Sequence, residues 1–246
     1  MGRVSGERIA IFGATSAIAQ GTALLLTQRG CDLVLVGRNA ARLEAVGADL
    51  RIRGKRPVRC VVADLADVGR HPELLAGVGD IDGALVAHGV LGDQERAERD
   101  FDHARQILDV NFTSAASLVT HLANQLEKRG RGRLVVIGSV AGDRGRKANY
   151  VYGASKAALD VLMQGVRHRL AGTGIQVLTV KPGIIDTPMT AHLPKTSMFA
   201  SSSEAARGIL AAMDRGAGVA YVPGRWRWIM MVIRNIPERV FHRMSN

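Results

Sequence analysis

The amino-acid sequence predicts an α/β fold: a Rossmann, doubly wound parallel sheet of about seven strands with helices on both faces. Two observations lead to this prediction. Short apolar runs alternate with helical patterns along most of the chain, and the inner runs, such as IAIF, LVLV and LVVI, are continuously apolar. A continuously apolar strand is typical of a parallel sheet covered on both faces. The length of 246 residues and the hydrophobic fraction of 47% suit one such domain.

The expected strands and helices follow one another in alternation. The predicted strands are Arg8–Phe12, Asp32–Val36, Val58–Val62, Gly83–Ala87, Arg133–Ile137, Gln176–Lys181 and Val219–Val222. The predicted helices are Ala17–Gln28, Asn39–Ile52, Ala97–Leu108, Thr113–Lys128, Tyr150–Leu170 and Ser203–Arg215. Right-handed crossovers bring the carboxyl ends of parallel strands to one edge of the sheet, so we expect the ligand crevice at that edge.

Composition and charge limit the class of protein. We expect a Rossmann domain over residues 1–223, with a substrate loop at residues 186–203, and a basic, apolar C-terminal segment at residues 224–246. The net charge of +11 favours anionic partners, but the chain shows no nucleic-acid-binding motif, so nucleic acid is not expected. No apolar run reaches the length of a membrane-spanning helix, and Met1–Arg8 is polar, so neither a membrane span nor a secretory signal is expected. Because Cys31 and Cys60 lack CxxC spacing, we expect no metal or redox site and a cytoplasmic protein.

The first predicted strand leads into a turn that suits a dinucleotide. Gly13 fills the tight-turn position, and the amides that follow face the phosphates at a helix N-terminus. Ala17 and Ala19 stand where glycine is usual, and the pattern by itself also fits a simple strand-to-helix turn. The residues predicted to contact the pyrophosphate are Gly13, Thr15, Ser16, Ala17 and Ile18.

Further cofactor residues are expected where other strands end. Arg38 follows the second strand and suits a 2′-phosphate, which favours NADP(H), although NAD(H) stays possible and Arg38 also fits a surface arginine beside a helix. Asp64 and Leu65 are expected at the adenine. Ala87, His88 and Gly89 are expected beside the adenosine ribose, with His88 as a wall of the cleft. Pro182, Gly183, Ile185 and Thr187 follow the sixth strand and are expected at the nicotinamide.

The most specific signal is a predicted catalytic group. Tyr152 and Lys156 are four residues apart at the start of a helix and so share one face. A lysine there is expected to lower the pKa of the tyrosine, which can then give a proton to a carbonyl oxygen as hydride arrives. Ser139, at the end of the fifth strand, can hold the same oxygen. Asn111 is expected to anchor a water that relays protons from Lys156.

These residues together resemble the short-chain dehydrogenase/reductase family over nearly the whole chain. GATSAIA stands for the glycine-rich turn of that family and AHG for its Asn-Ala-Gly motif. Asn111, Ser139, Tyr152 and Lys156 stand for its catalytic tetrad. The resemblance implies an NAD(P)-dependent oxidoreductase and a homo-oligomer, a dimer or a tetramer, formed through the predicted helices Thr113–Lys128 and Tyr150–Leu170.

Three stretches show a narrower resemblance. Val86–Glu95, Gly142–Asp160 and Trp228–Phe241 are similar to reductases that act on the 2-keto group of a pentofuranose linked through phosphate to a polyprenol, in arabinan synthesis for the cell envelope. This implies an arabinofuranosyl lipid as product and a flavin oxidase as partner. Reduction of another ketone, sugar or lipid alcohol is the alternative, and a cofactor-binding regulator would not need the catalytic group.

Two basic regions agree with a lipid-phosphate substrate. The loop before Tyr152 carries Arg144, Arg146 and Lys147, which either hold a phosphodiester or are simply solvated. The C-terminal segment carries five arginines, one glutamate and the tryptophans Trp226 and Trp228. It suits a peripheral contact with the inner face of the plasma membrane, or else covers the substrate cleft or a subunit contact.

Overall fold

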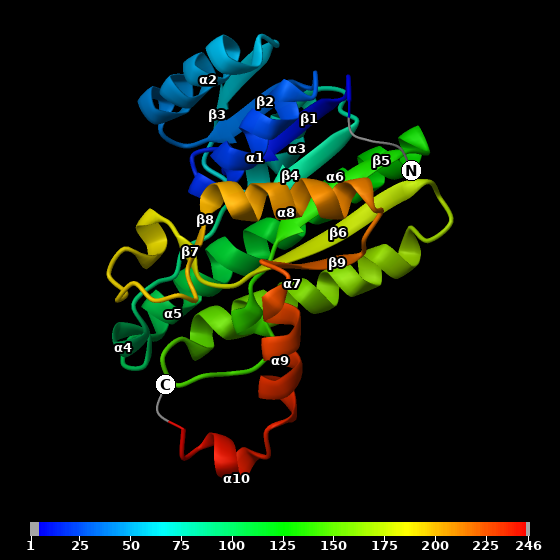
Figure 1. Ribbon diagram of the computed structural model, residues 1–246. Coiled ribbons are helices and arrows are strands. Elements are labelled where there is room, and N and C mark those ends of the chain that lie inside the picture. The colour runs from blue at the N-terminus through cyan, green and yellow to red at the C-terminus, as the bar shows by residue number, and fades with distance from the viewer. Residues whose placement is uncertain (1–4, 245–246) are drawn as a thin grey trace.

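The computed structural model describes residues 5–244 (Figure 1). Residues 1–4, at the start of the predicted domain, and 245–246, at the end of the predicted C-terminal segment, lie outside the described residues. Seven parallel strands form the main sheet in the order β3-β2-β1-β4-β5-β6-β9, so the predicted doubly wound parallel sheet is confirmed. Their bounds are β1 Arg8–Phe12, β2 Asp32–Gly37, β3 Val58–Val62, β4 Gly83–Val86, β5 Gly132–Ile137, β6 Ile175–Pro182 and β9 Val219–Val222.

The strand order reverses beside β1, and this reversal positions the ligand crevice. Phe12 of β1 pairs with Val36 of β2 on one side and with Val86 of β4 on the other. The chain therefore runs outward from β1 to β3 and then returns to start β4. Loops that leave β1 and β4 diverge to opposite faces, which opens a crevice at the carboxyl ends of the strands.

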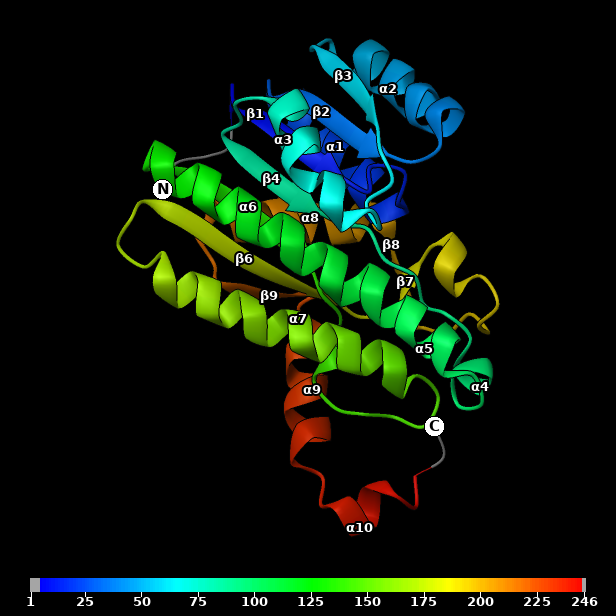
Figure 2. The same cartoon turned by 180° about the vertical axis from the view of Figure 1, so that it is seen from behind.

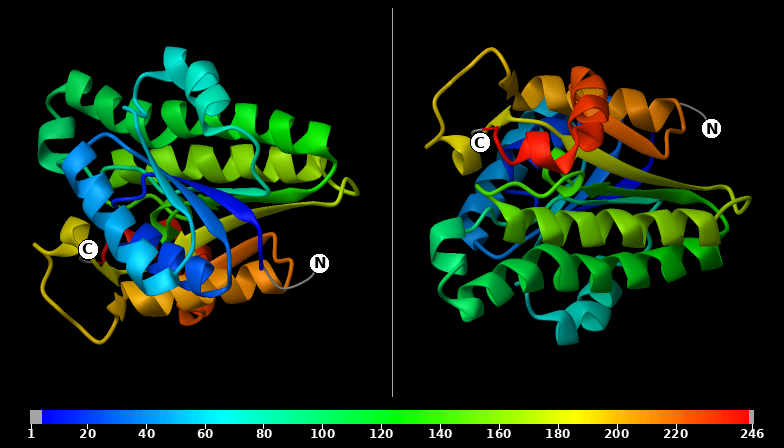
Figure 3. Two further views of the ribbon diagram at one scale, coloured as in Figure 1. Left: turned by 90° about the horizontal axis from the view of Figure 1, so that it is seen from above. Right: turned by 90° about the horizontal axis from the view of Figure 1, so that it is seen from below.

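Helices cover both faces of the sheet (Figures 1 and 2). One layer consists of α1 Ala17–Gln28, α2 Ala40–Gly54 and α8 Ser202–Asp214. The other consists of α3 His71–Val78, α5 Phe101–Leu108, α6 Ser114–Arg129 and α7 Tyr150–Arg169. The views from above and below show the sheet between these two layers (Figure 3). Each layer has its own buried apolar cluster against one face of the sheet, which explains the continuously apolar strands.

The structure also differs from the sequence-based prediction. The predicted helix Ala97–Leu108 is interrupted: α4 spans Gln94–Ala97, and Asp100 caps the start of α5 by accepting from the amide of His103 at 3.2 Å. Helix α3 and helix α9, Arg225–Asn235, were not predicted. Within the predicted substrate loop, β7 Ile185–Asp186 and β8 Ala200–Ser201 pair as a small second sheet.

The C-terminal residues 225–244 form an arm that projects from the body of the molecule (Figures 1 and 2). It contains α9 and the short α10, Glu238–Phe241. The arm begins beside the end of β6, where Trp226 packs against Gly183. A Cβ on residue 183 would lie 1.8 Å from the indole nitrogen of Trp226. Within residues 5–244, no helix combines the length and the apolar character needed to cross a membrane.

Candidate active site

The turn between β1 and α1 packs directly on the end of β4. Gly13 has φ +82°, and a Cβ at this position would lie 2.6 Å from the backbone nitrogen of His88. A side chain is therefore excluded both by the backbone conformation and by the space. Ser16 caps α1 by accepting from the amide of Ala19 at 3.2 Å. Ala19, which stands where glycine is usual, is fully buried in the core, and Thr15, Ala17 and Ile18 line the same turn.

The loop after β2 presents a cation at a helix start. Arg38 is exposed, and no hydrogen bond or ion pair ties it to the part of the chain that the structure describes. Asn39 caps α2 by accepting from the amide of Arg42 at 2.9 Å. The Arg38 guanidinium is thus available to an anion near the N-terminus of α2, where the helix dipole also favours negative charge.

A chain of hydrogen bonds joins the end of β4 to the loop after β3. Ser114 donates to the carbonyl oxygen of Leu65, and Nε2 of His88 lies 2.9 Å from the Ser114 hydroxyl. Because the single hydroxyl proton of Ser114 goes to a carbonyl, His88 must donate from Nε2. His71 completes the chain, since its Nε2 donates to the same carbonyl at 3.1 Å. Asp64, just before Leu65, is exposed and accepts from the amide of Ala66 at 3.0 Å.

His88 is neutral and leaves one buried nitrogen without a partner. Burial, together with the nearby charge of Lys156, lowers the pKa of His88 to about 3. With the proton on Nε2, Nδ1 is a bare acceptor; it is buried and meets no donor among the described residues. A buried polar atom is normally hydrogen-bonded, so this nitrogen marks a place where a ligand donor fits. Ala87 and Gly89 flank His88 at the end of β4, and Gly89 lies against the Asn111 side chain.

Tyr152 and Lys156 lie together near the start of α7, as predicted. The ammonium nitrogen of Lys156 is 5.8 Å from the centre of the Tyr152 ring and donates to the carbonyl oxygen of Ile137 at 3.1 Å. Ser139 follows Ile137 at the end of β5, near enough to the phenol for its hydroxyl to counter part of the effect of burial on the pKa of Tyr152. The same hydroxyl accepts from the amide of Ala141 at 3.1 Å, which fixes its position. The structure therefore brings three of the four predicted catalytic residues into one group.

The electrostatics of this group correct one prediction. We expected Lys156 to lower the pKa of Tyr152, but burial of the phenol raises it, and the hydrogen bond from Ser139 offsets only part of the rise. Burial also lowers the pKa of Lys156 to about 8. The physical reason is the same for both residues, because burial favours the neutral form of either group. At neutral pH the phenol is thus protonated and the lysine charged.

The Asn111 side chain is hydrogen-bonded to the backbone of the loop after β4. It is fully buried in a single π-helical turn, Asp109–Thr113, between α5 and α6. Its side chain accepts from the amide of Val90 at 2.7 Å and donates to the carbonyl oxygen of Val90 at 2.8 Å. The side-chain amide therefore clamps the loop after β4, and the predicted water relay remains a prediction. π-Helical turns inside helices are frequent at functional sites.

The three basic residues of the loop before Tyr152 have different surroundings. Arg144, predicted to hold substrate, instead donates to the carbonyl oxygens of Ile233, Arg234 and Ile236 at 3.0, 3.2 and 2.6 Å. It caps the last turn of α9, whose carbonyls have no partner within the helix. Arg146 is half-buried, and within residues 5–244 its guanidinium donates one hydrogen bond, to the sulfur of Met230 at 3.6 Å. Burial lowers the pKa of Arg146. Lys147 is exposed.

A buried ion cluster that the sequence reasoning missed holds this loop. Lys181 of β6 donates to Asp143 at 2.6 Å and to Asp160 of α7 at 2.8 Å, and Tyr221 of β9 donates to Asp143 at 2.7 Å. The side chains of Lys181 and Asp143 are only 7% and 2% exposed. A lysine inside a predicted inner strand was the available signal, because a buried charge requires a partner.

The residues predicted to contact the nicotinamide, in the segment after β6, have different surroundings. Pro182 ends β6, and Gly183 lies against Trp226. Ile185 is buried in the core. Thr187 starts a short 3-10 helix, and its amide donates to the hydroxyl of Thr190 at 3.2 Å.

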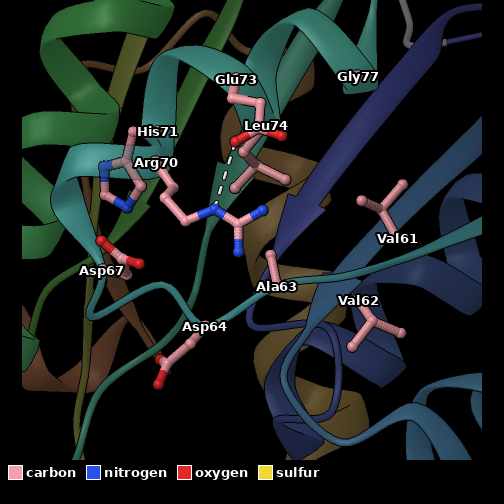
Figure 4. A pocket seen from close by; sticks show the side chains of 10 residues that line it. All are labelled: Val61, Val62, Ala63, Asp64, Asp67, Arg70, His71, Glu73, Leu74 and Gly77. Carbon is pink, nitrogen blue, oxygen red and sulfur yellow. Dashed lines mark hydrogen bonds and ion pairs between the residues drawn. The ribbon is translucent and has the colours of Figure 1, made fainter.

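A separate hollow of about 250 Å³ lies beside the end of β3 (Figure 4). The ion pair between Arg70 and Glu73, at 3.3 Å, lies among its lining residues. Of the predicted site residues it includes only Asp64, and none of the catalytic group. This hollow is therefore separate from the group formed by Ser139, Tyr152 and Lys156.

Comparison with known proteins agrees with this geometry. A profile of the family described as short chain dehydrogenase matches residues 7–197. An uncharacterized oxidoreductase of Mycobacterium tuberculosis is 37% identical over 240 residues, which cover 96% of each chain. One of Streptomyces coelicolor is 35% identical over 238 residues, which cover 95% of this chain and 94% of that protein. The solved structure of a short-chain dehydrogenase from Sphingobium yanoikuyae in complex with NADPH is 26% identical, covers 97% of this chain and 98% of that one, and has a TM-score of 0.80.

The chain therefore belongs to the short chain dehydrogenase family. It is an NAD(P)-dependent oxidoreductase.

The buried ammonium of Lys156 predicts a gain in stability when it is removed. Its pKa of about 8 lies below the ordinary value of 10.5, so the unfolded chain binds more protons between these values, and the charge destabilises the fold below pH 8 by about 3 kcal/mol. Lys156→Met also leaves the Ile137 carbonyl without this donor, a loss of about 1 kcal/mol. We expect a net gain of about 2 kcal/mol at pH 7 in urea denaturation, which disappears as pH rises toward 10.5.

The exposed Lys147 provides the control, and Lys147→Met is expected to leave both stability and its pH dependence unchanged. A Lys156→Met variant that is less stable than the parent at pH 7 contradicts the assignment of a strained buried charge.

Proposed function

We propose that this enzyme reduces the 2-keto group of a polyprenyl-phosphate-linked pentofuranose with NADPH, giving the arabinofuranosyl lipid for cell-envelope glycan synthesis. The main support is that Ser139, Tyr152 and Lys156 form one group and that a short loop joins this group to Arg146. The guanidinium of Arg146 is half-buried and has no ion pair among residues 5–244. The three stretches of sequence similarity to decaprenylphosphoryl-2-keto-ribose reductase support the choice of substrate.

The residues at the crevice fit a dinucleotide. Gly13 keeps the turn free of a side chain, and His88 offers a buried acceptor that suits a ribose hydroxyl. Arg38 offers a free cation for a 2′-phosphate, so we propose NADP(H) as the preferred cofactor, with NAD(H) as the other possibility. The Sphingobium yanoikuyae relative, which was solved with NADPH, supports this preference.

The catalytic residues divide the chemistry of ketone reduction. A bound reduced nicotinamide supplies the hydride. Tyr152, whose raised pKa keeps the phenol protonated, donates its proton to the carbonyl oxygen as negative charge develops there. Ser139 holds the same oxygen with a hydrogen bond. Lys156, charged at neutral pH, stabilises the phenolate that remains on Tyr152.

The substrate phosphate is assigned to the loop before Tyr152. Arg146 lies partly out of water, and among residues 5–244 its guanidinium has a sulfur acceptor and the nearby charge of Asp143 but no direct ion pair. A phosphodiester would supply that direct anionic partner. The exposed Lys147 adds charge beside it. Arg144 is withdrawn from the predicted substrate residues, because the carbonyls at the end of α9 already occupy its guanidinium.

The predicted partners remain part of the proposal. A flavin oxidase would make the keto sugar, and we propose a dimer or tetramer through α6 and α7, where Val161 is 67% exposed. Because a polyprenyl substrate stays in the bilayer, the enzyme would work in the cytoplasm at the inner face of the plasma membrane. The alternative is a reductase of another ketone, sugar or lipid alcohol, for which Arg146 would have no phosphate to bind.

Tyr152→Phe tests the acid role. Removing only the phenolic proton is expected to lower kcat for ketone reduction by at least about 100-fold, the usual size of general acid catalysis. NADPH affinity, measured by quenching of intrinsic fluorescence, is expected to stay within about twofold, because the phenol is not needed to bind the cofactor. Retained turnover would refute the assignment of Tyr152 as proton donor.

Arg38→Ala tests the cofactor preference. Loss of a charge-assisted contact to the 2′-phosphate is expected to raise the Kd of NADPH by about 10- to 100-fold and to leave that of NADH nearly unchanged. Arg42→Ala is the matched control and should change neither value, because Arg42 is an exposed arginine on the helix α2 that follows Arg38. Equal weakening of the two cofactors would mean that Arg38 does not recognise the phosphate.

Arg146→Gln tests the substrate class. With a keto-pentofuranosyl phospholipid, we expect KM to rise about tenfold while kcat stays within about twofold, because a phosphate contact is lost away from the reacting carbonyl. A keto sugar without phosphate should show no change in KM. Arg131→Gln is the control, because Arg131 is an exposed arginine at the amino end of β5, away from the crevice edge. If the parent enzyme does not turn over the phospholipid at all, the proposed substrate is wrong.

A further inference from the structure

The arm presents a second apolar face that nothing in the described chain covers. Trp228, Met231 and Val232 of α9 are 63%, 52% and 61% exposed, and Val240 and Met244 beyond it are 52% and 46% exposed. We name these five residues the outer face of the arm. The spacing of 228, 231 and 232 puts three of them on one side of the helix.

The opposite side of α9 is already used for packing. Trp226 and Met230 are 4% and 0% exposed and form a buried cluster with Val140, the residue after Ser139. From the sequence, both tryptophans were assigned to one C-terminal segment that could lie at a lipid surface. The structure separates them: Trp226 anchors the arm to the catalytic body, and Trp228 is left for an external partner.

Charge indicates what kind of partner fits. The arginines of the arm are all exposed: Arg225, Arg227, Arg234, Arg239 and Arg243. Glu238 is the one acidic residue among the described residues of the arm. Its carboxylate oxygens already lie 3.0 Å from Nε2 of His242 and 3.8 Å from the guanidinium of Arg144. A tryptophan with aliphatic side chains and surrounding arginines suits the boundary between lipid headgroups and acyl chains, where apolar burial and attraction to anionic lipid act together.

The same charges disfavour a second copy of the chain on this face. A two-fold contact sets a surface against itself, so the arginines of one arm would face those of the other. Unpaired like charges brought together at an interface are strongly unfavourable. An anionic surface, by contrast, has the charge opposite to that of the exposed arginines of the arm.

The arm is also held rigidly to the catalytic edge. Arg144 caps α9 through the carbonyls of Ile233, Arg234 and Ile236, and its guanidinium lies 4.1 Å from the centre of the Phe241 ring. Asp143, the preceding residue, belongs to the buried ion cluster with Lys181. The position of the arm is therefore fixed relative to the loop that follows Ser139.

We propose that the outer face of the arm binds an anionic lipid bilayer, with Trp228, Met231 and Val232 inserted at the headgroup boundary. Docking there holds the loop of Arg146 and Tyr152 beside the membrane surface. The inference deepens the proposed function by naming the membrane-contacting face, but it is tested with lipid alone, so it stands or fails independently of the substrate.

The experiment measures sedimentation of the full chain with sucrose-loaded vesicles of phosphatidylcholine, with and without phosphatidylglycerol. The parent protein is expected to bind the anionic vesicles and to be released as salt is raised, because screening weakens attraction to anionic lipid. The double variant Trp228→Ser/Val232→Ser is expected to lower the partition coefficient by at least about tenfold. Phe101→Ser is the matched control, because Phe101 on α5 is 74% exposed but lies outside the arm.

Tryptophan fluorescence locates the contact within the bound protein. The chain has two tryptophans, one buried and one exposed, so insertion of Trp228 is expected to shift the emission to shorter wavelength on anionic vesicles. Trp228→Phe is expected to retain most of the binding and to lose the shift, because only the buried Trp226 then reports.

Three outcomes would overturn the proposal. They are failure of the parent protein to bind anionic vesicles, equal binding by the Trp228→Ser/Val232→Ser variant, and a blue shift that persists in Trp228→Phe. A parent oligomer that dissociates in the double variant, measured by analytical ultracentrifugation without lipid, would assign the outer face to a second copy instead. Failure of keto-phospholipid turnover with normal vesicle binding would reject the proposed substrate and leave this inference standing.

Discussion

The arrangement of the reaction edge depends on the buried contact of Lys181 with Asp143 and Asp160. This contact joins strand β6, helix α7 and the loop after Ser139, and Tyr221 adds strand β9. Asp160 lies one helical turn beyond Lys156, so the cluster also fixes the helix that carries the proposed catalytic lysine. A buried charge without its partner is strongly destabilising, which makes the position of each element depend on the others.

Burial favours the neutral form of each ionisable group at this edge. It lowers the pKa of His88 to about 3 and that of Lys156 to about 8, and it raises the pKa of Tyr152. Neutral histidine and protonated tyrosine can therefore stand close to a charged lysine without a second cation in the crevice. This state suits proton donation to a ketone, whereas a tyrosine ionised beforehand would suit the reverse oxidation.

The arm extends this edge outward instead of closing it. Its inner side packs on Val140 through Trp226 and Met230, and Arg144 binds its end. The basic loop thus has two separate roles that its composition does not distinguish. Arg144 caps the end of helix α9, whereas the Arg146 guanidinium has its one hydrogen bond within residues 5–244 to the sulfur of Met230.

Local pattern determined much of the protein. All seven strands of the main sheet were predicted to within one residue at each end, because apolar continuity is a property of each strand and the sheet covers both faces. The turn at Gly13 and the shared helical face of Tyr152 and Lys156 also follow from spacing within a few residues. The break at Asp100 and helix α3 were missed, because capping and short helices leave little periodic signal.

Only the tertiary structure decided the partners of the charged and polar side chains. The sequence by itself determined the sheet, the crevice edge and the catalytic spacing, since these depend on local periodicity and on strand ends meeting at one edge. The role of Arg144, the tautomer of His88, the partners of Lys181 and the division of the arm into an inner and an outer face depend on residues distant along the chain. Such contacts form only when the packed helices and strands bring those residues together, and no local pattern encodes them.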